Sequence, residues 1–418
     1  MQFRRVVVTG LGVVSPIGNN VQDFWKNLIS GLSGAAPITL FDALEFKTRF
    51  ACEVKGFDPS VYLDRKEARK LDRFSQFAIA CSDQALEDSG LLNYAELDKE
   101  SVGVIWGAGI GGMDTFTNEC IAFAEGGRIP RFNPFFIPKV ISDIAPGHIS
   151  IRHGFQGMNF TTVSACASST NALIDALMYI RLGKASVIVA GGSEATVGVS
   201  GIGGFNAMHA LSTRNDDPST ASRPFDKDRD GFVMGEGGAC LILEDLEHAL
   251  KRGTKIYAEL VGGGMSADAH HLTAPHPEGL GATKVMNRTL EDAGLKPEDI
   301  DYINVHGTST PLGDVAEAKA IQKVFGKHAY KLNISSTKSM TGHLLGAAGA
   351  MEAAATVMAV QHNLIPPTIN HFTDDPELDK NLNFTFNKAQ EREVRAALSN
   401  TFGFGGHNAS VIFKKYKA

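Results

Sequence analysis

Three side chains that lie far apart in the sequence have the chemistry of a thioester-forming enzyme. Cys166 stands between a short apolar segment and an apolar helix, and His306 and His343 follow in turns rich in Gly, Ser and Thr. A cysteine at a helix N-terminus meets free N–H groups and a partial positive charge, which favour the thiolate and cradle an oxyanion. An imidazole can donate a hydrogen bond to a developing negative charge. One soft nucleophile with two imidazoles therefore predicts acyl transfer through a covalent intermediate.

An internal repeat predicts how these side chains are positioned. The sequence at 86–91 (LEDSGL) returns at 290–295 as LEDAGL, and each copy ends a helix with a glycine in the capping position. A strand follows each copy. Further along, a strand followed by an apolar helix also occurs twice, and Cys166 and His343 lie at the two junctions; we expect these helices at 171–182 and 346–362. Both helices are apolar on nearly every face, which predicts an interior position.

Short apolar strands that alternate with helices indicate an α/β fold with buried sheets. We expect two duplicated halves, residues 1–253 with the cysteine and residues 254–418 with both histidines. No low-complexity or linker-like stretch separates them. The halves are therefore expected to share one continuous core, in which the N-termini of the two central helices meet.

The bulk composition restricts the function classes. The 418 residues carry a net charge of −6, which does not favour nucleic-acid binding. The five cysteines are scattered without a C-x-x-C pair, which is typical of reduced thiols in a cytoplasmic protein. No apolar run approaches the roughly 20 residues of a membrane span, and the N-terminal apolar run is too short for a signal peptide. We expect a cytoplasmic protein that binds neither nucleic acid nor membrane.

Four separated motifs resemble those of the β-ketoacyl-acyl-carrier-protein synthases, in particular the elongating synthase II type. The motifs occupy 163–167 (VSACA), 306–314 (HGTSTPLGD), 338–343 (KSMTGH) and 400–408 (NTFGFGGHN), and the resemblance covers essentially the whole chain. It implies a five-layered αβαβα thiolase-like fold with two pseudo-duplicated halves. It also implies an acyltransferase that joins malonyl-carrier to an acyl-cysteine by decarboxylative Claisen condensation and lengthens the acyl chain by two carbons.

The resemblance assigns roles to the residues of these motifs. Cys166 is the nucleophile, and His306 and His343 bind the malonyl thioester carbonyl. The resemblance does not assign the activation of a water during decarboxylation to either histidine. The backbone N–H groups of Cys166 and Phe404 form the oxyanion hole, and Phe404 between its glycines gates the acyl tunnel. Thr308 and Thr310 bind the phosphopantetheine arm; as plain turn hydroxyls they would carry no function.

A lysine and a glutamate flank His343. Glu352 lies in an alanine-rich apolar helix, where an unpaired carboxylate would be costly. We therefore predict a buried pair between Lys338 and Glu352 that orients the His343 loop, and the family carries a matching pair.

By the same resemblance, Ile110 lines the acyl pocket and Phe135 reaches that pocket across a homodimer interface. The basic run that contains Lys66, Arg69 and Lys70 is either a solvated helix face or a docking patch for the acidic acyl carrier protein. Such a patch would also include Arg128 and Arg131. The reaction is expected to need no metal and no cofactor beyond the arm of the carrier.

Two positions depart from the family pattern. His209 stands where relatives tend to carry arginine, which weakens the docking patch at that end, and His407 stands where threonine is expected, which leaves the contacts of the gate open.

Several alternatives are weaker. The segment Thr9–Ser15 hints at a dinucleotide fingerprint, but a serine holds the third glycine position. His270, His271 and His276 lack the spacing of a known metal site. A thiolase would need a second cysteine, and a plant-type or initiating synthase an asparagine, at His343. A non-catalytic chain-length subunit would lack Cys166.

Overall fold

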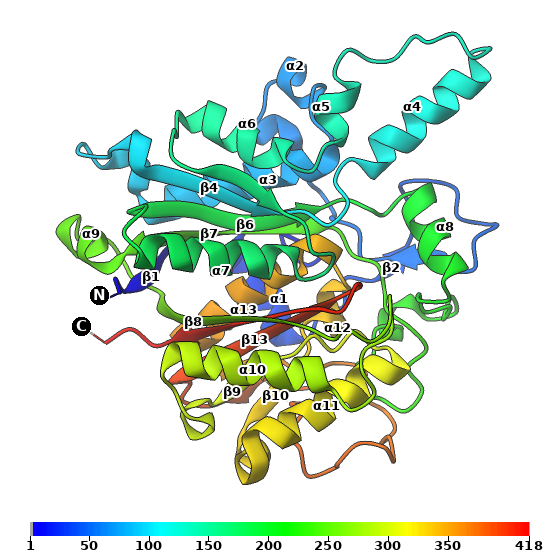
Figure 1. Cartoon of the computed structure of the whole chain (residues 1–418). Helices are drawn as coiled ribbons and strands as arrows, with labels where there is room; N and C mark the ends of the chain where they lie inside the picture. Colours follow the sequence, from blue (N-terminus) through cyan, green and yellow to red (C-terminus); the bar gives the residue numbers. More distant parts are fainter. Residues whose placement is uncertain (1–2, 418) are drawn as a thin grey trace.

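Two copies of one strand–helix pattern meet in a ten-stranded sheet with the order β5-β4-β6-β7-β1-β8-β14-β13-β9-β10. The computed structural model describes residues 3–417 (Figure 1). The first half contributes β1 (Val6–Val14), β4 (Val102–Gly107), β5 (Asn159–Thr162), β6 (Val187–Glu194) and β7 (Gly237–Asp245). The second contributes β8 (Ala258–Ala267), β9 (Tyr302–Asn304), β10 (Asn333–Ser335), β13 (Ala396–Gly403) and β14 (His407–Lys414).

The pairing pattern is the same in both halves. β5, β4 and β6 are parallel to one another, and β7 and β1 continue the sheet in antiparallel pairs. In the second half β10, β9 and β13 are parallel, and β14 and β8 are antiparallel. This correspondence confirms the internal duplication expected from the sequence.

The two halves diverge from a narrow junction, because β1 and β8 pair only at Val7–Glu259 and Val8–Ala258. Helices α7 (Ser168–Arg181) and α13 (Ala348–His362) fill the space between the half-sheets and contact strands of both. Helix α3 (Arg73–Ser89) covers the outer face of one half and α10 (Leu280–Ala293) that of the other (Figure 1). The result is the expected α-β-α-β-α layering.

The central helices carry the site. α13 is buried from Ala348 to Val360, as expected, and its small residues allow α7 to approach closely. A Cβ at Gly349 would lie 2.0 Å from Oγ1 of Thr170, so only glycine fits this contact. α7 differs from the expectation of complete burial, because Met178 and Tyr179 on one face are exposed. The close crossing brings the segments that precede both helices to the middle of the molecule.

The remaining helices and strands surround this core. The halves expected to meet at 253/254 are joined by the loop between α9 and β8, and we propose this point as their boundary. The other helices and strands are α1 (Val21–Ser30), α2 (Arg65–Ala68), α4 (Met113–Glu125), α5 (Phe136–Val140), α6 (Ile144–His153), α8 (Val199–Ala207), α9 (Leu246–Lys251), α11 (Pro311–Phe325), α12 (Lys338–Thr341), β2 (Ala36–Pro37), β3 (Phe50–Ala51), β11 (Leu364–Ile365) and β12 (Gln390–Glu391). None of the helices within residues 3–417 has the length and apolar character needed to cross a bilayer.

Candidate active site

Cys166 stands on a strained turn between β5 and α7. The preceding Ala165 has φ +50°, a left-handed conformation that is unfavourable for a residue with a Cβ. Ser168 stabilises the turn, because its Oγ accepts from the Ser164 N–H at 2.9 Å and donates to the Ala165 carbonyl at 2.7 Å. The turn presents the Cys166 side chain to the cavity while its backbone leads directly into the buried helix. Backbone strain directly beside a reactive side chain is typical of a functional site.

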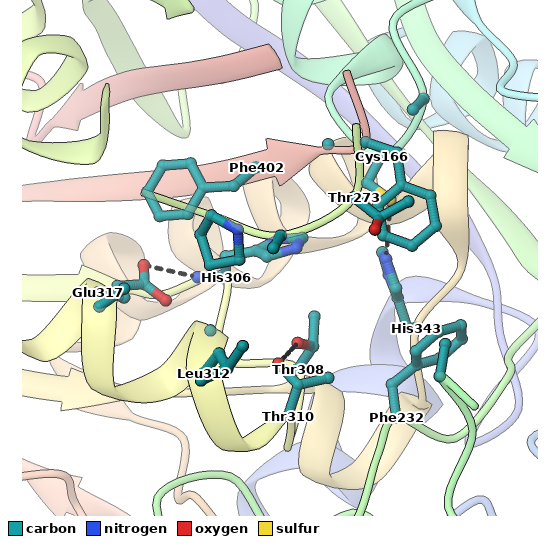
Figure 2. Close-up of a pocket in the computed structure, with 18 of the residues that line it drawn as sticks. Cys166, Phe232, Thr273, His306, Thr308, Thr310, Leu312, Glu317, His343 and Phe402 are labelled. Carbon is teal, nitrogen blue, oxygen red and sulfur yellow. Dashed lines mark hydrogen bonds between the residues drawn. The ribbon is translucent and has the colours of Figure 1, made fainter. Parts of the chain in front are cut away.

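His343 touches the nucleophile. Its Nε2 lies 3.0 Å from the Cys166 sulfur (Figure 2). Burial raises the pKa of the Cys166 thiol to about 12, although Lys338 and the backbone N–H of Phe404 act in the opposite direction. Burial and the Lys338 charge lower the pKa of His343 well below its ordinary value. Burial therefore opposes the activation expected from the helix end, and in the resting site a neutral thiol can donate to a neutral imidazole.

His306 completes the group of three side chains. Its ring centroid lies 5.3 Å from that of His343, with the rings nearly perpendicular, and both histidines line the cavity that contains Cys166. Burial lowers the pKa of His306 as well. Nδ1 of each imidazole is buried without a hydrogen-bond partner among the residues that the structure describes. No hydrogen bond at Nδ1 therefore fixes the tautomer of either imidazole.

A buried carboxylate that the sequence analysis missed holds the His306 turn. Glu317 on α11 accepts from the His306 N–H at 2.9 Å and the Gly307 N–H at 2.8 Å (Figure 2). The amide of Asn400 donates to the same carboxylate at 3.2 Å. The signal was present in the sequence, since Glu317 lies among apolar residues of a helix just as Glu352 does.

The pKa of Glu317 predicts how the free energy of unfolding depends on pH. Burial raises its pKa to about 7, above the ordinary value of 4.5 and against the lowering by its hydrogen bonds. A carboxyl whose pKa is raised by folding contributes stability at low pH that is lost as the pH rises through the folded-state value. We expect the wild type to lose about 3 kcal/mol more than Glu317→Gln between pH 4 and pH 8. Urea unfolding at several pH values measures this difference, and parallel pH profiles for the two proteins would contradict it.

The predicted pair between Lys338 and Glu352 is confirmed. Lys338 Nζ contacts Glu352 Oε1, and each side chain is 2% exposed. Burial raises the pKa of Glu352 to about 7, and Lys338 opposes that rise. Lys338 begins α12, which leads into the His343 turn, so the pair anchors the segment that carries this imidazole.

The catalytic group lies in a cavity of about 590 Å³. Thr308, Thr310 and Ile110 line it, as expected, and the two threonine hydroxyls lie 3.0 Å apart (Figure 2). Phe404 also lines the cavity, in the turn between β13 and β14, and its backbone N–H is directed at the Cys166 sulfur. The Gly405 N–H in this turn donates to the Leu272 carbonyl at 2.7 Å.

The departures from the family pattern lie at the edges of this site. The exposed His407 begins β14 beside the same turn, and its ring lies against Gly405, where an added Cβ would come within 3.0 Å of Nε2. His209 is exposed and also lines the cavity.

Other predicted site residues lie elsewhere. Phe135 does not line the cavity of its own chain, and the Lys70 ammonium lies 5.4 Å from the centre of its ring. The predicted docking residues are exposed and also lie outside the cavity lining: Lys66, Arg69, Lys70, Arg128 and Arg131. Among residues 3–417, no group of three or more His, Cys, Asp or Glu side chains is arranged to hold a metal ion.

Comparisons with known proteins match both halves of the chain. The β-ketoacyl synthase N-terminal domain matches residues 3–249, and the β-ketoacyl synthase C-terminal domain matches residues 257–372. A 3-oxoacyl-[acyl-carrier-protein] synthase 2 from Synechocystis sp. is 50% identical over 417 residues, which is 100% of this chain and 99% of the relative. The protein of the same name from Coxiella burnetii is 51% identical over 99% of both chains.

Solved structures agree with these matches. A β-ketoacyl synthase from Burkholderia phymatum superimposes with a TM-score of 0.92 at 35% identity, covering 99% of this chain and 100% of that one. A second structure is described as a type II PKS acyl-carrier protein in complex with its ketosynthase. It superimposes with a TM-score of 0.91 at 32% identity, covering 99% of this chain and 100% of that one.

Proposed function

The chain belongs to the β-ketoacyl synthase family, and from this premise we propose how its site performs the reaction. The enzyme is a 3-oxoacyl-acyl-carrier-protein synthase of the second type, an acyltransferase that condenses malonyl-carrier with an acyl-cysteine. The observation that carries the mechanism is the 3.0 Å contact between the Cys166 sulfur and His343 Nε2, in a cavity that His306 also lines. Cys166, His306 and His343 are the catalytic residues.

In the first half-reaction, the Cys166 sulfur attacks the thioester carbonyl of the acyl-carrier. The thiol proton passes through His343 Nε2 to the departing carrier thiol, so the site stays neutral overall. The backbone N–H groups of Cys166 and Phe404 stabilise the oxyanion of the tetrahedral intermediate. Phe404 sits in a turn whose glycines have φ +85° and +74°, which permits the turn to move as a gate.

In the second half-reaction, Thr308 and Thr310 bind the phosphopantetheine arm of malonyl-carrier. His306 and His343 donate hydrogen bonds to the thioester carbonyl oxygen, where charge develops as CO₂ leaves. The enolate carbon attacks the acyl carbon, the bond from that carbon to sulfur breaks, and the Cys166 thiolate takes up one proton from water, so each condensation consumes one proton. Because the loss of CO₂ drives the condensation, we assign no resident metal or cofactor.

A product assay tests this function. Incubation with acyl-carrier and malonyl-carrier is expected to give a 3-oxoacyl-carrier two carbons longer than the acyl substrate, with one CO₂ released per product. Mass spectrometry of the phosphopantetheine arm identifies the product. Transfer of the acyl group without CO₂ release, or release without chain extension, would contradict the condensation.

We also propose a homodimer. β5 is an edge strand of the sheet, and an unpaired edge is a template for pairing with a second chain. Exposed apolar side chains adjoin this edge, including Val163, which is 61% exposed, and the face of α7 with Met178 and Tyr179. In the dimer Phe135 reaches the acyl pocket of the partner. We place the enzyme in the cytoplasm, in keeping with its five free thiols.

The docking patch for the acyl carrier protein gives a kinetic prediction. Replacing Lys66, Arg69 and Lys70 by Glu is expected to raise KM for the carrier about tenfold at low salt, with kcat within about twofold, because the patch acts on encounter. The effect is expected to shrink as salt is added. A control with Lys327, Lys331 and Lys380 replaced by Glu changes the net charge equally on exposed positions outside the cavity lining. Equal effects of the two triple variants would contradict a local docking site.

A further inference from the structure

A buried carboxylate connects two loops that the reaction uses separately. Glu194 ends β6 and has no solvent exposure. Its Oε2 accepts from the Gly109 N–H at 2.7 Å and from the Gly346 N–H at 3.0 Å. Its Oε1 accepts from the Ile110 and Gly111 N–H groups at 3.2 and 3.1 Å.

The two loops face different parts of the substrate. The loop at 109–111 follows β4 and places Ile110 in the cavity wall. Gly346 follows His343 by three residues, and the intervening Leu345 lines the same cavity. A Cβ at Gly346 would lie 2.1 Å from the Gly109 nitrogen and 2.7 Å from Glu194 Oε2. The loops therefore touch backbone to backbone, and the carboxylate lies at their contact.

Packing alone does not explain the carboxyl group of Glu194. Burial raises its pKa, and the four backbone N–H groups act against that rise. The hydrogen bonds described above all come from backbone N–H groups of these two loops. A carboxylate buried in this way costs more free energy than a neutral side chain of the same shape. The carboxylate holds the two loops more firmly than a neutral group would, because hydrogen bonds to an ionised acceptor are shorter and stronger than neutral ones.

We propose that Glu194 is a positioning residue that fixes the acyl-pocket loop and the His343 turn relative to each other. An acyl chain that presses on Ile110 then acts on the same carboxylate that holds Gly346, and through it on the imidazole beside the Cys166 sulfur. Chain length is thereby linked to the placement of His343. This inference rests on the proposed function, because it requires an acyl-Cys166 intermediate.

The substitution Glu194→Gln tests the link with little change in shape. The amide turns its NH₂ group either toward the Ile110 and Gly111 N–H groups or toward the Gly109 and Gly346 N–H groups. The loop at 109–111 therefore loses at least one acceptor in both orientations, and in the second orientation Gly346 loses its acceptor as well. We expect the rate of tetradecanoyl transfer to Cys166 and the rate of malonyl-carrier decarboxylation each to fall about tenfold. Butanoyl transfer also uses His343, but its short chain does not press on Ile110, so we expect its rate to fall only about threefold. A control, Glu53→Gln, removes another buried carboxylate that accepts backbone N–H groups, those of Thr39 and Leu40. It is expected to change none of the three rates.

The outcomes are distinct. Equal slowing of all three rates in Glu194→Gln, or no change in the long-to-short ratio, overturns the positioning role. If the variant does not fold, hydrogen exchange of the wild type decides the question. Tetradecanoyl acylation, compared with butanoyl acylation, must then alter exchange at 109–111 and 345–346 together, and a difference confined to 109–111 overturns the link. A wild type that forms neither a butanoyl nor a tetradecanoyl adduct overturns the proposed function along with it.

Discussion

Cys166→Ala is expected to abolish acyl-enzyme formation and to lower the condensation rate by about 10⁴-fold or more. The reason is chemical, because alanine has no nucleophile and no other thiol lines the cavity among the described residues. Intact-protein mass spectrometry after incubation with acyl-carrier measures the effect directly. The wild type is expected to gain one acyl mass and the variant none.

Two controls show whether the loss of activity comes from the missing Cys166 nucleophile. Cys120 is the exposed thiol on α4, and Cys120→Ala is expected to keep the full adduct. Decarboxylation of malonyl-carrier alone is expected to persist in Cys166→Ala, because His306 and His343 are intact. An acyl mass that remains on Cys166→Ala but disappears in Cys120→Ala would remove the nucleophile assignment.

The sequence, together with the family resemblance of its motifs, was sufficient to predict the architecture and the residues that meet at the site. The repeat at 86–91 and 290–295 predicted two equivalent halves, and the strand pairing confirms them. Periodicity and motif spacing carry such information because each half folds by the same local rules. The pair between Lys338 and Glu352 was predictable for a different reason, since a charge in an apolar helix requires a partner.

Features set by tertiary contact were not predictable in the same way. The left-handed Ala165 follows from the turn that the surrounding structure imposes, and alanine itself gives no sign of it. The thiol of Cys166 was expected to be activated by its helix, yet burial raises its pKa to about 12, because desolvation depends on everything packed around it. Glu194 is recognisable only when loops 109–111 and 345–347, more than two hundred residues apart, are seen in contact.

Lys338→Met is expected to be the most destabilising of the changes considered. It leaves Glu352 buried without its cation, and breaking a buried pair in this way costs about 3–5 kcal/mol. Replacing both partners, Lys338→Met with Glu352→Leu, is expected to recover most of that loss because no charge remains unpaired. Urea unfolding of the two variants measures the recovery.

Activity is expected not to recover with stability in the double variant. The Lys338 charge lowers the pKa of both His306 and His343, and its loss favours imidazolium over the neutral imidazoles that shuttle the thiol proton. The pH below which condensation falls is therefore expected to shift upward. A matched control is Lys251→Met, which breaks an exposed pair with Glu96 and is expected to change neither stability nor the pH profile. A double variant with restored stability and the wild-type pH profile would show that Lys338 serves the fold alone.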